Sequence, residues 1–221
     1  MNRAELTYSI ILPTCNRASL VKEFLKSVDA QGQKPLELIL VDQSDSEETK
    51  TVFDQWDPAG IQKKYIYNEV KSLILARNAG IKACAQTDLI AFFDDDILLD
   101  LKFCEEVVRV FEADKQGVYA GGMGTVDQWN YKAKPFQAFF LMPYEGSGKF
   151  LASGVPTYPH WKREFSETEF VSGGCTFWRN HIIKEYLFDE RLSDYGHGDD
   201  VDVSYRISRR YKLFLQPKAI C

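Results

Sequence analysis

The first hundred residues alternate short, wholly apolar runs with stretches in which apolar residues recur at helical spacing. Uninterrupted apolar runs are typical of strands that are buried on both faces of a parallel sheet. The expected strands cover residues 8–12, 36–41, 64–67 and 89–93, and the expected helices cover residues 20–28, 73–85 and 102–111, with another through Val52 and Trp56. Ser44 and Glu47 have capping-box spacing at the start of that last helix. The alternation predicts an α/β fold, with a mostly parallel central sheet flanked by helices.

The second half of the chain has a different character. Residues 121–124 (Gly-Gly-Met-Gly) interrupt the alternation, and residues 128–170 hold many aromatic side chains among Gly, Pro and Ser. A strand is expected over 170–178, a helix over 200–210 and a short last strand over 213–216. The length of 221 residues favours one domain over two independent ones.

Composition excludes several classes of protein. The net charge is −5, from 27 basic and 32 acidic residues, and no dense basic run is present, which argues against a nucleic-acid binder. The five cysteines include no C-x-x-C pair, so a reducing, cytoplasmic location is expected. No apolar stretch approaches the ~20 residues of a membrane span. Peripheral contact with the inner face of a membrane stays open, as does the oligomeric state.

Polar residues follow each of the four expected strands of the first half. They are Asn16-Arg17, Asp42, Asn68-Glu69 and Asp94-Asp95-Asp96. Ligands of open α/β sheets bind at the carboxyl ends of the strands. These four groups are therefore expected to converge on one crevice.

The acidic run 94–96 is the strongest local signal. Three adjacent carboxylates after a buried strand repel one another unless a cation or hydrogen-bond donors compensate. Asp94 and Asp96 lie on the same side of an extended strand end, so both can reach one ion. Mn²⁺ and Mg²⁺ favour such oxygen ligands and leave positions for phosphates. A solvated acidic turn that caps the next helix is the simpler alternative, and the preceding apolar run favours the metal site.

Five motifs in order resemble family 2 glycosyltransferases of the GT-A fold. They are YSIILPTCNR at 8–17, LVDQSD at 40–45, ARNAG at 76–80, FFDDD at 92–96 and GDDVDVSYR at 198–206. Each motif alone is weak, but five in this order are specific. The resemblance implies one GT-A domain over 1–221, with a nucleotide-sugar-binding half (1–115) and a smaller acceptor-binding, catalytic half (116–221). It also implies transfer from a nucleotide sugar, typically a UDP-sugar, to a saccharide or lipid-linked saccharide, in polysaccharide or cell-wall synthesis.

The resemblance also assigns roles to single residues. It implies nucleotide contacts for Pro13, Thr14 and Arg17, a base contact for Asp42, a base or diphosphate contact for Arg77, donor contacts for Asp94 and Asp95, Mn²⁺ or Mg²⁺ ligation by Asp96 and Asp94, and a place beside the acceptor for Gly173 and Gly174. Asp200 would be the catalytic base, and Asp199 stands where the family commonly has Glu, so it is the second candidate. Aromatic faces stack on sugar rings, so Trp161 is expected in an acceptor platform, although a core lid explains the aromatic residues of 128–170 nearly as well.

The expected chemistry follows from the bond that breaks. The leaving diphosphate gains charge, which a metal ion and an Arg stabilise. One carboxylate must also take the proton of the acceptor hydroxyl. A single base opposite the diphosphate, Asp200, predicts inversion at the anomeric carbon. Residues 198–200 also suit a helix N-terminus, which would keep Asp200 ionised.

Two other functions stay open. A non-catalytic nucleotide-sugar-binding subunit would keep Asp94 and Asp96 but would not need Asp200. A sugar nucleotidyltransferase needs a glycine-rich loop near the first strand, and residues 13–17 contain no glycine. The resemblance also implies a His metal ligand downstream of the base helix, and no His follows Lys212. Either this ligand is absent, or water completes the shell, or the chain is a C-terminally truncated piece of a longer protein. Truncation is the favoured expectation, because residues 217–221 end without a terminal helix.

Overall fold

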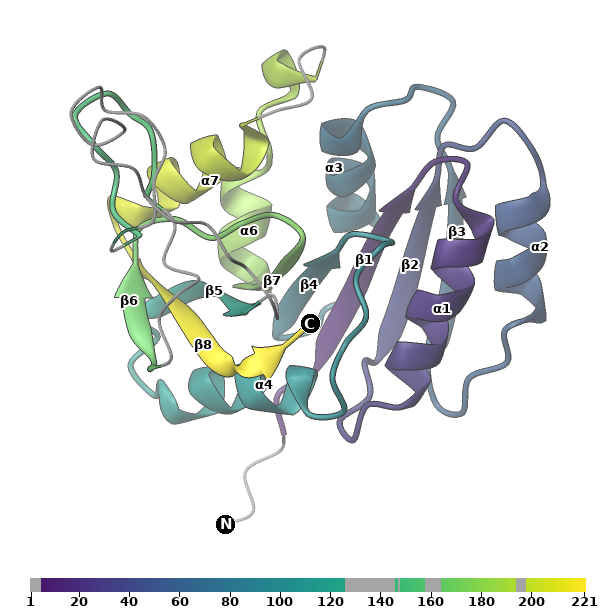
Figure 1. Ribbon diagram of the computed structural model, residues 1–221, viewed down its shortest axis with the longest axis horizontal. Helices are drawn as coiled ribbons and strands as arrows, with labels where there is room; N and C mark the ends of the chain where they lie inside the picture. The colour runs from purple at the N-terminus through teal and green to yellow at the C-terminus, as the bar shows by residue number, and fades with distance from the viewer. Residues whose placement is uncertain (1–4, 126–145, 147, 158–163, 194–197) are drawn as a thin grey trace.

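One mixed sheet runs through the computed structural model, which describes residues 5–125, 146, 148–157, 164–193 and 198–221 (Figure 1). The strands are β1 (Tyr8–Thr14), β2 (Glu37–Asp42), β3 (Gln62–Tyr67), β4 (Leu89–Phe93), β5 (Tyr119–Thr125), β6 (Ser166–Thr168), β7 (Cys175–Arg179) and β8 (Lys212–Ile220). The helices are α1 (Ala18–Asp29), α2 (Glu48–Gln55), α3 (Leu73–Ala83), α4 (Phe103–Ala113), α6 (Asn180–Tyr186) and α7 (Asp199–Ser208), with a 3₁₀ turn η1 (Glu190–Leu192). None of the described helices is long and apolar enough to cross a bilayer.

The eight strands lie in the order β3-β2-β1-β4-β7-β5-β8-β6. Strands β3, β2, β1 and β4 are parallel to one another, and β5 is parallel to β8. Strand β7 lies between these two groups and runs antiparallel to both β4 and β5. The mostly parallel sheet expected from the sequence is confirmed, with a reversal at β7 that the sequence does not indicate.

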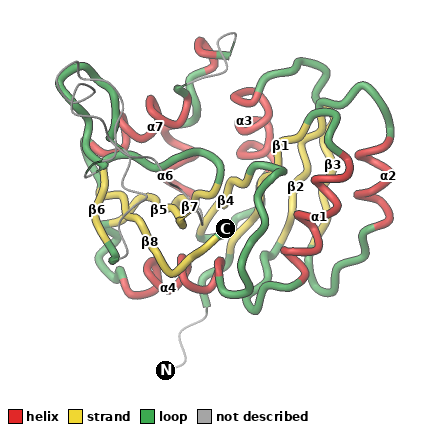
Figure 2. Tube along the Cα trace, viewed as in Figure 1, coloured by secondary structure: helices red, strands yellow, loops and turns green. Residues whose placement is uncertain are grey.

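Helices cover both faces of the sheet, as Figure 2 shows for the red segments on either side of the yellow strands. One apolar cluster holds side chains of α1, α2 and α4, and a second holds side chains of α3, α6 and α7. Strand β1 alternates between the two: Ile10 and Leu12 belong to the first cluster and Ile11 to the second. Leu20 and Leu36, expected inside, are 38% and 40% exposed, because the buried positions begin one residue later at Val21 and Glu37.

The glycines expected to interrupt the pattern instead lie within a central strand, β5. A Cβ at Gly121 would lie 2.4 Å from the Trp178 ring, and one at Gly122 would lie 2.2 Å from the Phe214 ring. The absent side chains therefore leave the space that two large core rings occupy.

A methyl group at position 122 is expected to destabilise the protein. Phe214 is fully buried and its ring packs against Phe111, Tyr119 and Phe165, so it has little room to move. Overpacking of this kind costs about 1–3 kcal/mol, so Gly122→Ala should lower the midpoint of thermal unfolding by several degrees. Gly32→Ala is the control, because a Cβ at that position would meet no atom of the described residues within 4 Å beyond its chain neighbours. Equal midpoints for the two variants would contradict the packing argument.

Three expected boundaries were wrong. Residues 170–174 are not part of a strand, since β7 begins at Cys175. The last strand is longer than expected and continues through Pro217 to Ile220. The Ser44–Glu47 capping box does not form: Glu47 is the N-cap residue of α2, and the Ser44 hydroxyl accepts from the Asn16 amide at 2.8 Å. A tertiary contact between two loops thus replaces the local cap.

Candidate active site

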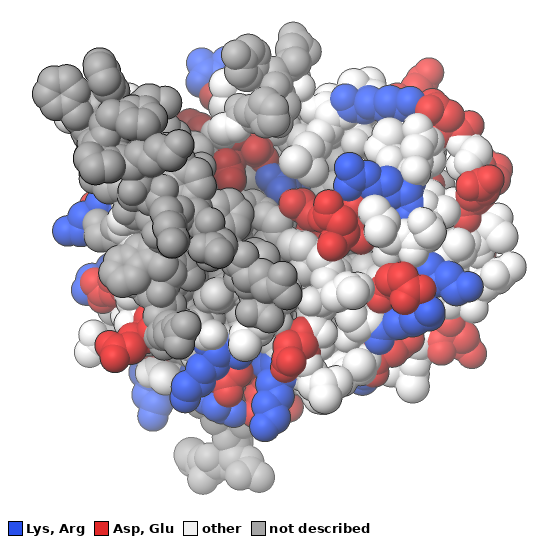
Figure 3. All heavy atoms as spheres, in the orientation of Figure 1, with Lys and Arg blue, Asp and Glu red and all other residues white. Residues whose placement is uncertain are grey.

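A cavity of about 430 Å³ opens at the carboxyl ends of β1 and β4. Its lining consists of Pro13, Thr14, Cys15, Arg17, Gln43, Leu73, Asp94, Asp95 and Asp96. In the sheet, β2 and β3 lie on one side of β1 and β4 lies on the other. The chain thus extends the sheet in one direction from β1 and then in the opposite direction, so the strand order reverses at β1. Such reversals are where open α/β sheets bind ligands. Figure 3 shows acidic atoms gathered near the middle of the displayed face, with basic atoms beside them.

Another cavity, of about 470 Å³, lies at the opposite end of the strands. Its lining includes Glu112, Asp114 and Arg179. Asp114 pairs with Arg179 at 3.1 Å and accepts from the amides of Val118 and Tyr119. This Asp–Arg pair is therefore already matched within the protein, and the cavity at 94–96, which has a run of three acids, is the better candidate for a charged ligand.

Asp95 is held inside the protein rather than offered to a ligand. Its carboxylate accepts from the Thr14 hydroxyl at 2.6 Å and from Arg17 at 2.9 Å, and only 5% of its surface is exposed. Arg17 also lies 3.6 Å from Asp96. The loops after β1 and β4 are thus joined, and Thr14 and Arg17 contact an acid of the acidic run.

Asp94 and Asp96 keep carboxylate oxygens open to the cavity. Their side chains are 44% and 57% exposed. Burial raises the pKa of Asp94 above its ordinary value; Arg77 opposes that rise, while Asp96 and Asp95 add to it. The described residues bring no group of three or more His, Cys, Asp or Glu side chains to one metal-binding point. Two hard oxygen ligands nevertheless fit Mn²⁺ or Mg²⁺, which usually complete their shells with substrate phosphates and water.

The four polar strand ends converge only in part, because Asp42, Asn68 and Glu69 are not in the cavity lining. Asp42 is 1% exposed, and its oxygens accept from the Ser44 amide and the Tyr65 hydroxyl, both at 2.9 Å. A base contact by Asp42 stays a prediction, and its carboxylate is already engaged.

Gln43, the next residue, lines the cavity instead. Its Nε2 donates to the carbonyls of Val70 and Ser72, which fixes the side-chain amide. No described donor contacts its Oε1, so a fixed acceptor remains on the cavity wall. Gln43 was not predicted as a site residue from the sequence. Its place directly after Asp42, at the end of a strand, could have indicated that it lies at the cavity.

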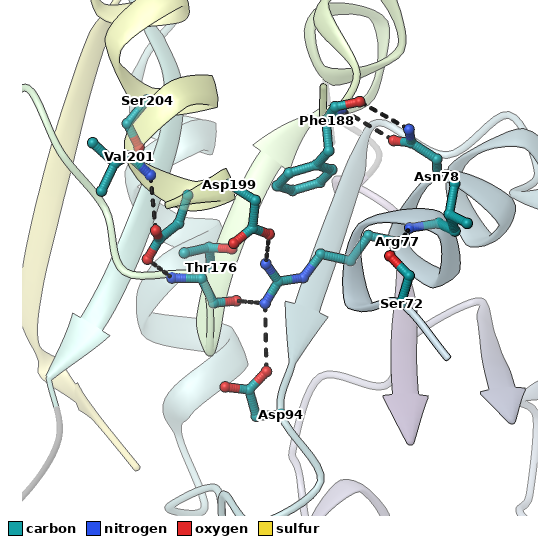
Figure 4. Close-up of polar contacts among 12 residues, drawn as sticks. Ser72, Arg77, Asn78, Asp94, Thr176, Phe188, Asp199, Val201 and Ser204 are labelled. Carbon is teal, nitrogen blue, oxygen red and sulfur yellow. Dashed lines mark hydrogen bonds and ion pairs between the residues drawn. The ribbon is translucent and has the colours of Figure 1, made fainter. Parts of the chain in front are cut away.

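Asp94 is also in contact with a second group of polar side chains, which Figure 4 shows together. Arg77, on α3, is 2% exposed and forms an ion pair with Asp199 at the start of α7. The same guanidinium donates to the Gly173 carbonyl at 3.1 Å and lies 3.4 Å from Asp94. The alternative that Arg77 is a surface arginine is therefore wrong.

Asp200 contacts the same glycine through its other backbone group. Its carboxylate accepts from the Gly173 amide at 3.1 Å and from the Val201 amide at 2.8 Å. Burial, with a further contribution from Asp199, raises the pKa of Asp200 above its ordinary value, and these two amide donors oppose the rise only partly. The Val201 amide, in the first turn of α7, favours the ionised carboxylate as expected for a helix N-terminus, but the effect of burial on the pKa is larger. A base with a raised pKa binds a proton more strongly.

Gly173 and Gly174 leave room for two of these side chains. A Cβ at Gly173 would lie 2.8 Å from Arg77, and one at Gly174 would lie 2.6 Å from Asp94. Their proposed place beside the acceptor stays a prediction. Trp161, expected in the acceptor platform, lies outside the described residues.

A comparison with protein families finds a match over most of the chain. The family model described as "Glycosyl transferase family 2" matches residues 9–187. A Campylobacter jejuni protein, GalNAc(5)-diNAcBac-PP-undecaprenol beta-1,3-glucosyltransferase, is 32% identical over 90 residues, which are 40% of this chain and 29% of that protein.

Solved structures share the fold at low sequence identity. GalNAc-T7, crystallised with UDP, GalNAc and Mn²⁺, superposes with a TM-score of 0.74 at 18% identity, over 99% of this chain and 44% of that one. The mannosyltransferase PcManGT from Pyrobaculum calidifontis, in complex with GDP-Man and Mn²⁺, gives 0.68 at 13% identity, over 98% and 56%. This chain thus spans less than two thirds of the length of these relatives.

Proposed function

The chain belongs to glycosyl transferase family 2, and from this premise we propose that it transfers a sugar, with inversion, from a UDP-sugar to an acceptor hydroxyl. The observation that carries the proposal is the pairing of two groups of acids. Asp94 and Asp96 face a cavity at the strand reversal, and Asp200 is linked to Asp94 through Gly173 and Arg77. These contacts support a donor-binding group and a base that are contributed by different parts of the chain and lie near each other.

The residues of the cavity would bind and orient the donor. Asp94 and Asp96 would hold Mn²⁺ or Mg²⁺, which when bound neutralises the charge that develops on the diphosphate. Pro13, Thr14 and Arg17 line the wall that faces the nucleotide in this proposal. Gln43, rather than the engaged Asp42, would accept a hydrogen bond from the base. Uracil offers an N3–H donor for such a contact.

Asp200 would move the proton. An acceptor hydroxyl that attacks the anomeric carbon from the side opposite the diphosphate must lose its proton, and the Asp200 carboxylate would take it. The amides of Gly173 and Val201 hold this carboxylate in place. Displacement from the opposite side by one base inverts the configuration. Asp199 is the weaker candidate because Arg77 occupies its carboxylate.

The acceptor proposed is a saccharide or lipid-linked saccharide. The name of the Campylobacter jejuni relative, a glucosyltransferase of an undecaprenol-linked saccharide, supports a lipid-linked acceptor. The inner face of a membrane is the place of transfer in this proposal.

A panel of donors tests the proposal. UDP-, GDP- and dTDP-sugars are added with and without Mn²⁺, and binding is followed by thermal shift and turnover by release of the nucleoside diphosphate. We expect a UDP-sugar to raise the unfolding temperature only with Mn²⁺ and to be turned over, because bound ligand stabilises the folded state. Tight binding without turnover with any acceptor would favour a non-catalytic subunit instead. A preference for GDP-sugars would refute the donor assignment alone.

A further inference from the structure

We infer that Arg77 is a positioning residue that couples the donor cavity to the base, and that it does not contact the nucleotide. The inference rests on the proposed function, and it departs from the base or diphosphate contact that the family resemblance implies for Arg77. The side chains of Arg77, Asp94, Asp199 and Asp200 and the backbone of Gly173 carry it.

The guanidinium of Arg77 lies away from the cavity. Its side chain is 3% exposed, and Arg77 is not among the residues that line the cavity. It packs over the Phe188 ring, with 5.3 Å between the guanidinium carbon and the ring centroid. Its two terminal nitrogens contact Asp199, Asp94 and the Gly173 carbonyl, and its Nε is buried without a partner among the described residues. A nucleotide phosphate would have to displace these partners to reach either terminal nitrogen.

The backbone of Gly173 has two different partners. Its carbonyl accepts from Arg77 and its amide donates to Asp200. These groups belong to the two successive peptide units that meet at the Gly173 Cα, so a shift of the guanidinium would pass through this one residue to the amide that holds the Asp200 carboxylate. Glycine is needed here because any Cβ would meet the Arg77 nitrogens at 2.8 Å.

Arg77 also links two acids that lie far apart in the sequence. It is the only cation among the described residues in contact with Asp94 or Asp199, and it contacts both. Asp94 directly follows β4, and Asp199 is the first residue of α7. The contacts of Arg77 with both acids thus fix the start of the helix that carries Asp200 relative to the end of β4. Arginine suits this task because its planar donors can bond several acceptors at fixed angles.

A double-mutant cycle tests the inference. Arg77→Lys keeps the positive charge but loses the planar set of N–H donors of the guanidinium. Asp199→Asn keeps the shape of the side chain but loses its charge. Each is expected to lower kcat about tenfold or more, with the KM for the donor and the metal-free affinity for UDP changed little, because misplaced groups slow the chemical step. The double variant should lose no more than the worse single variant, since both break the same link. Arg179→Lys is the matched control: its buried pair with Asp114 lies at the far end of the sheet.

Four outcomes would overturn the inference. They are a tenfold loss of metal-free UDP affinity in Arg77→Lys, an unchanged kcat, losses that multiply in the double variant, and an equal loss of kcat in Arg179→Lys. If Arg77→Lys does not fold, Arg77→Met with Asp199→Leu removes both charges at once and avoids an unpaired buried one; normal kcat in that variant also refutes it.

Hydrogen exchange separates this inference from the proposed function. If the unaltered protein neither binds UDP nor turns over any donor, the proposed function fails. The amide of Gly173 then decides the inference alone. Faster exchange there in Arg77→Lys than in Arg179→Lys supports the link, because the amide would be held less firmly. Equal exchange in the two variants refutes it.

Discussion

Replacement of Asp200 by asparagine should lower the rate of sugar transfer by about 10²–10⁴-fold, the usual contribution of a general base. Asparagine has nearly the same shape, and its carbonyl oxygen can still accept from the Gly173 and Val201 amides that now hold the carboxylate. Donor affinity should therefore stay the same while kcat falls. Steady-state kinetics with the preferred donor, alongside calorimetric binding of UDP with Mn²⁺, measure both quantities. Retained transfer would move the base elsewhere, with Asp199 as the first residue to replace.

The same carboxyl group predicts how transfer depends on pH. Asp200 must be ionised to take a proton, and burial raises its pKa. Transfer should therefore be full above that raised pKa and be lost as the pH falls through it, at a higher pH than an ordinary aspartate would give. The pH profile of kcat, compared with that of Asp200→Asn, checks this.

Removal of one of the two carboxylates proposed to hold the metal ion is expected to have a large effect on donor binding. Asp96→Ala should abolish the part of the UDP affinity that depends on Mn²⁺, because a site with only two protein carboxylates loses half of its charged ligands. Calorimetric titration of UDP with and without Mn²⁺ measures that part directly. Asp100→Ala is the control, since Asp100 is a nearby exposed acid outside the cavity lining. An unchanged Mn²⁺ effect in Asp96→Ala would refute the metal site.

The position of the acidic run at the edge of the sheet, and the sheet itself, could be predicted because both depend on the local pattern of apolar residues. The apolar run at 89–93 indicates a buried strand, and the residues that follow such a strand must lie at the edge of the sheet. The family resemblance and the fold class are confirmed on this basis.

Other features depend on residues far away in the sequence. The burial of Arg77 requires Asp199, which is 122 positions further along the chain. The engagement of Asp42 requires the Tyr65 hydroxyl on the neighbouring strand, and this leaves Gln43 as the residue on the cavity wall. No periodicity within either segment carries that information.

Strand β5 shows the same limit for packing. Glycines usually weaken a strand, so the run 121–124 suggested an interruption. Only the positions of Trp178 and Phe214 reveal why they are needed in the sheet.

The place of β7 in the sheet also bears on how the protein folds as it is synthesised. Strands β4 and β5 are both made before β7, which must then insert between them. Until residue 179 leaves the ribosome, the wholly apolar strand β4 keeps an unpaired edge, which is a template for joining another chain. Translation proceeds at about 5–20 residues per second, so this edge stays open for seconds. Newborn chains thus pass through a period when a chaperone that covers β4 would limit aggregation.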